Sequence, residues 1–184
     1  MTVYKGLFLD RDGVVNYDTG YVFQVSEFKF MPGVFELCLS AQKLGYRLIV
    51  VTNQAGIARG YYSESEFLSL TAWVEEEFRS RGIEIADTYY CPHHEDFNGA
   101  CDCRKPAPGM ILKAAQALEI DLEASVFIGD KPSDMLAAIR AGVPNRWLIT
   151  DVSDEGCESA TEVWKNFDGM AEVLEQMQVH NEPH

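Results

Sequence analysis

The stretch YKGLFLDRDG, residues 4 to 13, joins a short apolar run to two aspartates and a glycine. Short runs rich in aromatic and branched residues are typical of buried strands. Side chains at positions i and i+2 of an extended chain point the same way, so Asp10 and Asp12 are expected to face one site. The stretch therefore predicts a buried strand that ends in a pair of carboxylates.

Four more apolar runs have the same character, and we expect strands over residues 46–52, 84–91, 125–130 and 146–150. Between and after them, apolar residues recur at helical spacing and stop at glycines, which predicts helices over about 34–44, 63–81, 111–118, 135–141 and 168–178. Strands that alternate with helices imply parallel pairing through right-handed crossovers. The predicted fold is one α/β domain over residues 1–184, a three-layer Rossmann-like parallel sheet, with residues 179–184 expected to form a disordered tail.

Length and composition exclude several classes of protein. The chain has 184 residues, a formal net charge of −14 and five cysteines. The acidic balance argues against nucleic acid as a partner, because nucleic-acid binding is dominated by Lys and Arg contacts to phosphate. No apolar stretch approaches the roughly 20 residues of a membrane span, and no signal peptide is evident. We expect a cytoplasmic monomer that acts on a small molecule, without a disulfide framework.

Polar and charged residues follow four of the predicted strands. Besides the two aspartates, these are Thr52 at the end of the second strand, Arg104 and Lys105 after the third, and Asp130 and Lys131 at the end of the fourth. In open parallel sheets, ligands bind at the carboxyl ends of the strands. Three carboxylates form a hard oxygen cluster suited to Mg²⁺. Lys105 can neutralise phosphoryl oxygens, and Thr52 can donate a hydrogen bond to them.

Other kinds of catalytic site lack their residues. The four histidines, at positions 93, 94, 180 and 184, lie in a cysteine-rich loop or in the tail, so none is placed to serve a Ser or Cys nucleophile. The chain contains neither a G-x-x-x-x-G-K nor a G-x-G-x-x-G loop, so a nucleotide cradle is unsupported. An aspartate that accepts a phosphoryl group remains the best-supported chemistry.

The segments FLDRDG, VVTNQ, RKP and GDKPSD occur in the order of the four motifs of the haloacid dehalogenase superfamily, and the chain resembles its phosphatases over most of its length. The resemblance implies that Asp10 is the nucleophile and Asp12 the general acid and then base. It implies Mg²⁺ on Asp10, the backbone carbonyl of Asp12 and Asp130. Thr52 and Lys105 would hold the phosphoryl group, and the motif includes Asp134, expected to orient Lys105 or to cap a helix.

The loops give a narrower resemblance. Only about 20 residues separate Asp12 from the first predicted helix, so we expect no cap domain, an open site and specificity carried by loops. The segments DTGYV, TNQAGIARG and CPHH with CDCRKPAPGM resemble bacterial D-glycero-D-manno-heptose 1,7-bisphosphate 7-phosphatases, enzymes of ADP-heptose and lipopolysaccharide core synthesis. The substrate contacts implied by this resemblance are Asp18, Thr19, Gly20, Tyr21, Thr52, Asn53, Gln54, Ala55, Arg104, Lys105 and Lys131.

Two alternatives stay open. Histidinol phosphatases share the four motifs and the cysteine loop, so histidinol phosphate is the competing substrate. A phosphorylated signalling switch also places Asp, Thr and Lys at the ends of a parallel sheet. A switch needs a long-lived aspartyl-phosphate, however, and a second carboxylate at Asp12, placed to activate water, would shorten that lifetime.

The cysteine loop, residues 91–103, predicts a second metal site. Cys91-x-His93 and Cys101-x-Cys103 supply four ligands of the type that zinc favours. Four protein ligands leave zinc no open position, which is typical of a structural site. Free thiols or a single disulfide are the alternative interpretations. His94 competes with His93 as the fourth ligand, and the family pattern favours His93.

Overall fold

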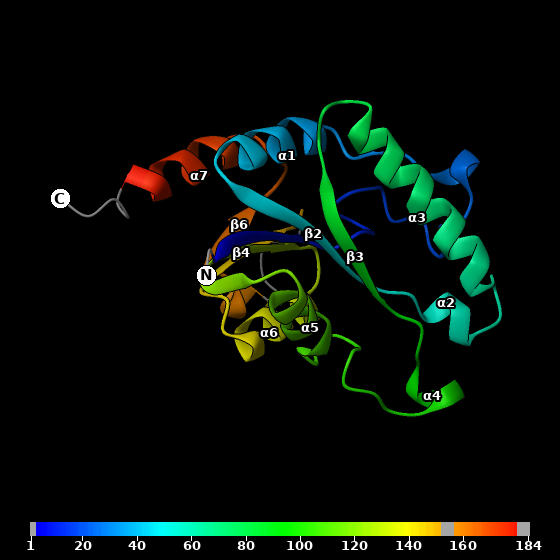
Figure 1. The fold of residues 1–184 in the computed structure, drawn as a ribbon. Coiled ribbons are helices and arrows are strands. Elements are labelled where there is room, and N and C mark those ends of the chain that lie inside the picture. The colour runs from blue at the N-terminus through cyan, green and yellow to red at the C-terminus, as the bar shows by residue number, and fades with distance from the viewer. Residues whose placement is uncertain (1–2, 152–156, 180–184) are drawn as a thin grey trace.

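The computed structural model describes residues 3–151 and 157–179, in which six parallel strands form one sheet (Figure 1). Residues 180–184 of the expected tail lie outside this range. The sheet order is β3-β2-β1-β4-β5-β6. The strands are β1 Tyr4–Leu9, β2 Tyr46–Asn53, β3 Ile85–Cys91, β4 Ile120–Gly129, β5 Asn145–Ile149 and β6 Glu162–Trp164. All five predicted strands are confirmed, although β4 begins five residues earlier than expected and β6 was not predicted.

Helices cover both faces of the sheet. They are α1 Val34–Lys43, α2 Ala55–Ala58, α3 Glu64–Arg79, α4 Glu95–Asn98, α5 Gly109–Ala117, α6 Pro132–Ala141 and α7 Met170–Val179, with 3₁₀ turns η1 Val25–Glu27 and η2 Cys157–Ser159. The five longer helices match the predicted ones. Helices α1, α3 and α7 contribute to one core and α5 and α6 to the other, which confirms the three-layer α/β prediction.

Strand β1 shows how the sequence produces two cores. Leu7 and Leu9 are buried in the core shared with α1, α3 and α7, whereas Phe8 is buried in the core shared with α5 and α6. Successive side chains of a strand point to opposite faces, so a strand covered by helices on both sides has to be apolar throughout. This central position of β1 places the residues that follow it at the middle of the sheet edge.

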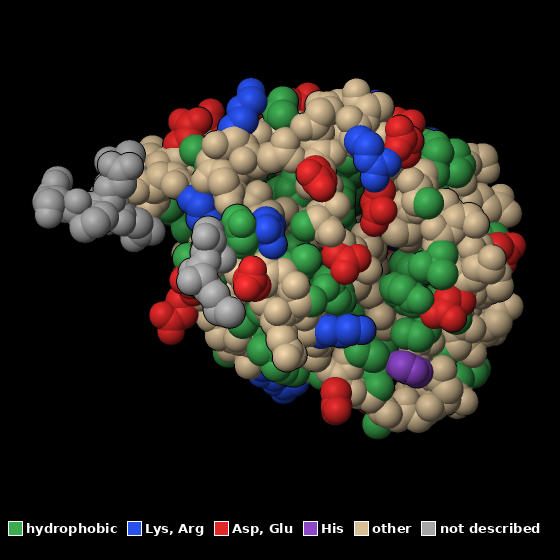
Figure 2. All heavy atoms as spheres, in the orientation of Figure 1, with side chains coloured by type: hydrophobic (Ala, Val, Ile, Leu, Met, Phe, Trp, Pro, Cys, Tyr) green, Lys and Arg blue, Asp and Glu red, His purple; other side chains and the backbone are tan. Residues whose placement is uncertain are grey.

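The segment from residue 10 to residue 33 contains only η1 and two isolated bridges. Within the described residues no cap domain is inserted, as the sequence predicted, and the carboxyl edge of the sheet is covered by loops. Figure 2 shows acidic side chains spread over one face rather than gathered in one patch. None of the helices in the described part of the chain is both long and apolar enough to cross a membrane.

Candidate active site

Asp10 lies at the end of the central strand and is only 5% exposed. Its backbone N–H donates to the carbonyl of Ile128 at 3.0 Å, which continues the pairing of β1 with β4. Carboxylate oxygens of Asp10, Asp130 and Asp134 lie within 4.8 Å of one another. The fold thus gathers at one point three acidic groups that lie up to 124 positions apart in the chain.

Lys105 reaches this cluster from the loop after β3 and is 4% exposed. Its Nζ lies 2.9 Å from Asp10 Oδ1 and 2.7 Å from Asp134 Oδ1. The same nitrogen donates to the carbonyl of Val51 at 2.9 Å. Burial alone would lower the pKa of Lys105, but the two carboxylates outweigh burial and hold the pKa above its usual value. Lys105 is therefore a fixed positive charge at the end of the sheet.

Asp134 performs both of the roles considered for it. Its Oδ1 binds Lys105, and its Oδ2 accepts hydrogen bonds from the backbone N–H groups of Asp130 and Lys131, each at 3.1 Å. The carboxylate thus caps the start of α6 and orients the lysine. Gly129 permits this arrangement because a Cβ there would lie 2.4 Å from the Cβ of Asp134.

The acidic cluster carries more negative charge than its protein partners neutralise. Burial, together with the neighbouring Asp134, raises the pKa of Asp130 to about 6. Burial and the Asp134 carboxylate likewise hold the pKa of Asp10 well above its usual range. Oδ1 of Asp130 is buried and has no hydrogen-bond partner in the described structure. A hard divalent cation would satisfy that oxygen and remove the repulsion, so these residues fit Mg²⁺.

Asp12 is held beside the cluster by several donors. Its Oδ1 accepts from Arg11 Nη2 at 2.8 Å and from Asn16 Nδ2 at 3.0 Å, and its Oδ2 accepts from Gln54 Nε2 at 3.1 Å. Gln54 Nε2 also donates to the hydroxyl of Thr52 at 2.8 Å. Asp12, the expected acid and base, and Thr52, an expected phosphoryl ligand, are thus joined through one amide group.

A cavity of about 590 Å³ opens over these groups. Of the predicted site residues, it is lined by Asp10, Asp12, Asp18, Gly20, Tyr21, Asn53, Gln54, Ala55, Arg104, Lys105 and Lys131. Thr19, Thr52 and Asp130 are not among the lining residues. Thr19 is exposed, Asp130 is half-buried, and Thr52 is buried and hydrogen-bonded to Gln54, which does line the cavity. The cavity is also lined by Tyr62, Pro106, Ser133 and Asp134, of which sequence reasoning had singled out only Asp134.

Two of the cations near the site are turned away from the cavity. Arg11 Nη2 binds Asp12 and also donates to the carbonyl of Val22 at 2.7 Å. The charge of Arg11 is therefore paired within the protein and does not face the cavity. Arg59 lies over the ring of Phe97, 5.0 Å from its centroid, and its Nη2 is 3.4 Å from His94 Nε2. Positive charge at the cavity wall instead comes from Arg104, Lys105 and Lys131.

Backbone and ion-pair contacts hold the walls in place. The side chain of Asn53 accepts from the N–H of Lys105 at 3.0 Å and donates to its carbonyl at 3.1 Å. Lys131 Nζ lies 3.2 Å from Asp18 Oδ2 across the opening. Asp18 Oδ1 also accepts from the N–H of Gly20 at 3.1 Å, which closes a tight turn before Tyr21.

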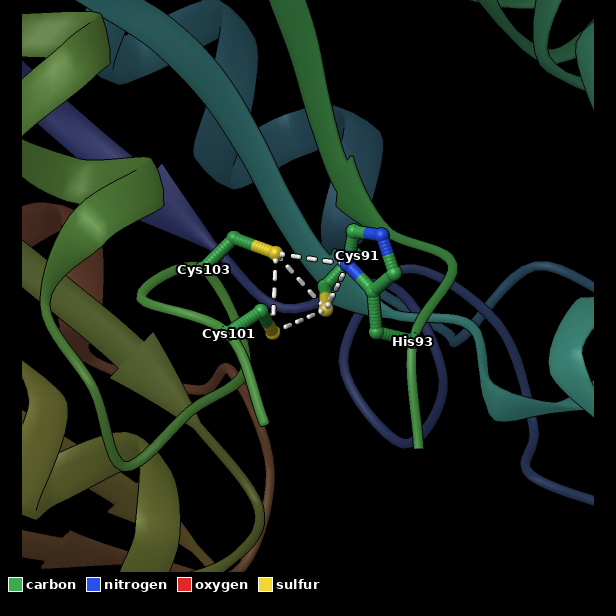
Figure 3. Close-up of side chains that lie close together, drawn as sticks. All are labelled: Cys91, His93, Cys101 and Cys103. Atoms are coloured by element: carbon green, nitrogen blue, oxygen red, sulfur yellow. Dashed lines mark hydrogen bonds between the residues drawn. The ribbon is translucent and has the colours of Figure 1, made fainter. Parts of the chain in front are cut away.

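The cysteine loop forms a compact cluster at the end of β3 (Figure 3). The Sγ atoms of Cys91, Cys101 and Cys103 lie 2.9 to 3.5 Å apart, and Nδ1 of His93 lies 3.3 Å from Cys103 Sγ and 3.7 Å from Cys91 Sγ. A tetrahedral zinc site with Zn–S near 2.3 Å has S···S edges of about 3.8 Å, so a small outward shift would admit the ion. His94 points to Arg59 instead, which separates the two histidines.

The donor set and the pKa of one thiol favour a metal at this cluster over free thiols. Burial raises the pKa of the Cys91 thiol, so that sulfur would lose its proton only on binding a cation. Burial alone would also raise the pKa of Cys101, but hydrogen bonds involving Cys103 and the backbone of Arg104 lower it to about 7. Three sulfurs and one imidazole nitrogen are the donor set of closed zinc sites.

The fold and this arrangement of Asp, Thr and Lys at the sheet edge define a phosphatase of the haloacid dehalogenase type. Residues 102–168 match the family model described as "HAD-hyrolase-like". The D-glycero-beta-D-manno-heptose-1,7-bisphosphate 7-phosphatase of Vibrio cholerae serotype O1 is 47% identical over 165 residues, which cover 85% of this chain and 89% of that protein. The enzyme of the same name from Pasteurella multocida is 41% identical and covers 92% of this chain and 96% of its own length.

The chain belongs to the family of D-glycero-beta-D-manno-heptose-1,7-bisphosphate 7-phosphatases. A solved structure supports this placement. The crystal structure of D,D-heptose 1,7-bisphosphate phosphatase from B. bronchiseptica, complexed with magnesium and phosphate, superposes with a TM-score of 0.81 at 29% identity. The superposition covers 94% of this chain and 98% of the B. bronchiseptica chain.

Proposed function

We propose that this protein hydrolyses the 7-phosphate of D-glycero-β-D-manno-heptose 1,7-bisphosphate, a step in ADP-heptose and lipopolysaccharide core synthesis. The observation that carries the proposal is the buried Asp10–Lys105 pair at the floor of a cavity lined by further cations. Such a floor suits a nucleophile that takes up a phosphoryl group, and the cations suit an anionic sugar. The relatives described above are named for the heptose bisphosphate, so histidinol phosphate is not the favoured substrate.

In the proposed reaction, Asp10 attacks phosphorus in line and becomes an aspartyl-phosphate. Asp12 protonates the departing sugar alkoxide and then takes a proton from the water that cleaves the acyl-phosphate. Lys105 and the hydroxyl of Thr52 neutralise and bind the phosphoryl oxygens. A signalling switch is disfavoured because Asp12 lines the same cavity as Asp10 and is placed to shorten the life of the phosphorylated state.

Magnesium is the proposed cofactor at the acidic cluster, where it would be held by Asp10, Asp130 and the backbone carbonyl of Asp12. When bound, it supplies positive charge to the transferring phosphoryl group. The fit rests on the unpartnered oxygen of Asp130 and on the raised pKa values of the two aspartates. The heptose bisphosphate phosphatase from B. bronchiseptica is complexed with magnesium.

Zinc is the proposed ion at Cys91, His93, Cys101 and Cys103, in a structural role. Lys105 follows Cys103 by two residues, and Arg104 between them donates to the carbonyl of His93 at 3.3 Å. A metal bound to the four side chains would therefore hold the backbone that carries both cations. Because reduced thiols are required, we also propose a cytoplasmic enzyme, and the interspersed charges of its surface favour a monomer.

The second phosphate of the substrate needs its own cations. Arg104 and Lys131 line the same cavity but, unlike Lys105, are not buried: Arg104 is half-buried, and 54% of the Lys131 side chain is exposed. We therefore assign the 1-phosphate to these two side chains. Asp18, which binds Lys131, would then contact the sugar or release the lysine to the phosphate.

The test is a phosphate-release assay with the two heptose 1,7-bisphosphate anomers, fructose 1,6-bisphosphate and histidinol phosphate. The β anomer should give the highest kcat/KM, and turnover should continue well beyond one equivalent of phosphate. The variant Asp10→Asn is the negative control and should lose turnover while keeping its fold. A higher kcat/KM for histidinol phosphate, or a single equivalent of phosphate released, would refute the proposal.

A further inference from the structure

The amide of Gln54 lies at the centre of a hydrogen-bond chain that ends on a tyrosine. Its Nε2 donates to Asp12 Oδ2 at 3.1 Å and to Thr52 Oγ1 at 2.8 Å. Its Oε1 accepts from the hydroxyl of Tyr62 at 2.5 Å. Gln54 and Tyr62 are only 2% and 5% exposed, so bulk water does not replace these bonds.

The chemistry of the neighbours decides which way the amide faces. A carboxyl oxygen that carries no proton only accepts hydrogen bonds, so the amide nitrogen has to face Asp12 Oδ2. The amide oxygen then faces the opposite side, where a buried acceptor needs a donor. The Tyr62 hydroxyl is that donor. Without it, the oxygen would be buried and unpaired, and the amide would be free to turn away from Asp12.

The position of Tyr62 is itself well defined. Its ring stacks on Phe23, with centroids 5.1 Å apart and an interplanar angle of 11°. Gly56 also lets the ring approach closely, because a Cβ there would lie 2.1 Å from its Cε1. Burial raises the pKa of Tyr62 to about 12, so its hydroxyl keeps its proton at neutral pH.

We propose that Tyr62 is a positioning residue for the phosphatase reaction, and that its hydroxyl fixes the Gln54 amide so that this amide orients both Asp12 and Thr52. The inference rests on the proposed function, in which Asp12 moves the protons and Thr52 binds the phosphoryl group. The Thr52 hydroxyl accepts from Gln54, so its own proton remains available to a phosphoryl oxygen. Tyr62 itself touches neither of the reacting groups in this chain of contacts.

The test compares Tyr62→Phe with Tyr61→Phe in the magnesium-loaded, zinc-loaded full chain. Tyr62→Phe removes the donor but keeps the stacked ring; Tyr61, 55% exposed, is the matched control. For the heptose bisphosphate, Tyr62→Phe should lower kcat about tenfold with KM changed less than about twofold, since an unpaired buried acceptor is costly and substrate contacts remain. Tyr61→Phe should match the wild type.

A double-mutant cycle with Gln54→Leu separates positioning from general loosening of the structure. Because Tyr62 acts through Gln54, adding Tyr62→Phe to Gln54→Leu should change kcat less than about twofold. Additive losses in the cycle, or a Tyr62→Phe kcat within about twofold of wild type, would overturn the proposal. Thermal unfolding of the four proteins of the cycle, which are the wild type, the two single variants and the double variant, checks that each is folded.

Assays of the same proteins on p-nitrophenyl phosphate keep this proposal separate from the choice of substrate. If the wild type turns over only the aryl phosphate, the assignment of the heptose substrate fails. The double-mutant cycle, measured on the aryl phosphate, then still tests the positioning role of Tyr62. If the wild type hydrolyses the heptose bisphosphate but the cycle is additive, the positioning role fails and the assignment stands.

Discussion

Lys105 and Asp10 form a buried ion pair, with Nζ 2.9 Å from Oδ1, although they are 95 residues apart in the chain. The same ammonium group also contacts Asp134 and the carbonyl of Val51, so three oxygens surround its three hydrogens. The side chain therefore has little freedom left. One lysine both stabilises the acidic cluster and supplies the positive charge that the proposed chemistry needs.

Replacement of Lys105 by Met should therefore reduce stability as well as turnover. Asp10 and Asp134 would lose their buried partner, and removal of one member of a buried ion pair costs about 3–5 kcal/mol. Urea unfolding at pH 7 in magnesium-free buffer measures this loss. Lys113→Met, on the exposed side of α5, is the control and should cost less than about 1 kcal/mol. Equal costs for the two variants would show that the buried pair does not stabilise the fold.

The acidic cluster should make the magnesium-free protein less stable as pH rises from about 4 to about 6. The pKa of Asp130 is raised from 3.8 to about 6 in the folded state. Between these values the unfolded chain releases the proton and the folded chain keeps it, so the free energy of unfolding falls by about 2–3 kcal/mol across the window. Urea unfolding at pH 4.5 and 6.5, in protein exchanged into magnesium-free buffer, measures the fall.

Asp130→Asn is the control for this pH dependence. It removes the titrating group, so its stability should fall less than that of the wild type between the two pH values. Added Mg²⁺ at pH 7 should stabilise the wild type more than the variant, since a ligand that binds only the folded state adds to its stability. The same pH profile in both proteins would rule out Asp130 as the group responsible.

Cys103→Ser should release the metal of the cysteine cluster and lower turnover. A closed zinc site that loses one of its four ligands binds the ion far less tightly, and the backbone of Arg104 and Lys105 is freed. We expect kcat to fall at least about tenfold. Elemental analysis after dialysis measures the zinc content. Cys38→Ala, on the buried face of α1, should keep one zinc per chain. Retention of zinc by Cys103→Ser would contradict the assignment.

Gly13→Ala should weaken magnesium binding. Gly13 has a φ of +87°, and a Cβ there would lie 2.1 Å from Asp130 Oδ2, so the carboxylate would have to move. The Mg²⁺ concentration that gives half-maximal activity should rise at least about tenfold. Gly82→Ala shares the positive φ but has open space around its Cβ, so it should cost about 1 kcal/mol of stability and leave the magnesium response unchanged. A similar magnesium response in both variants would exclude the collision as the cause.

Lys131→Ala should affect the bisphosphate more than a monophosphate. The Lys131 side chain is largely exposed, so its ion pair with Asp18 adds less than about 1 kcal/mol to stability. Its loss should raise KM about tenfold for the heptose 1,7-bisphosphate, since a charged hydrogen bond to the 1-phosphate is lost. KM for heptose 7-phosphate, which lacks that group, should change little. Equal changes in both KM values would place Lys131 away from the 1-phosphate.

The sequence by itself determined the elements and the residues at their ends. The alternation of Leu7, Phe8 and Leu9 between two cores and the spacing of Asp10 and Asp12 follow from the geometry of a single strand. Neighbours along one strand or helix keep fixed relative directions, so such patterns can be read without a structure. The three-residue strand β6, with two exposed residues, is too short to leave such a pattern.

Only the tertiary structure decided which groups share a contact. In the structure Arg11 binds Asp12 and the carbonyl of Val22, and Arg59 lies against His94, so both arginines are turned away from the cavity. Tyr62 is joined through Gln54 to Asp12. Arg11, Asp12 and Val22 share one loop. The contacts of Arg59 with His94 and of Gln54 with Asp12 join different loops, whose relative positions depend on how the sheet and helices pack. Spacing along the chain carries no information about distances across a packed interface, so sequence could propose the reacting residues but not the amide that orients them.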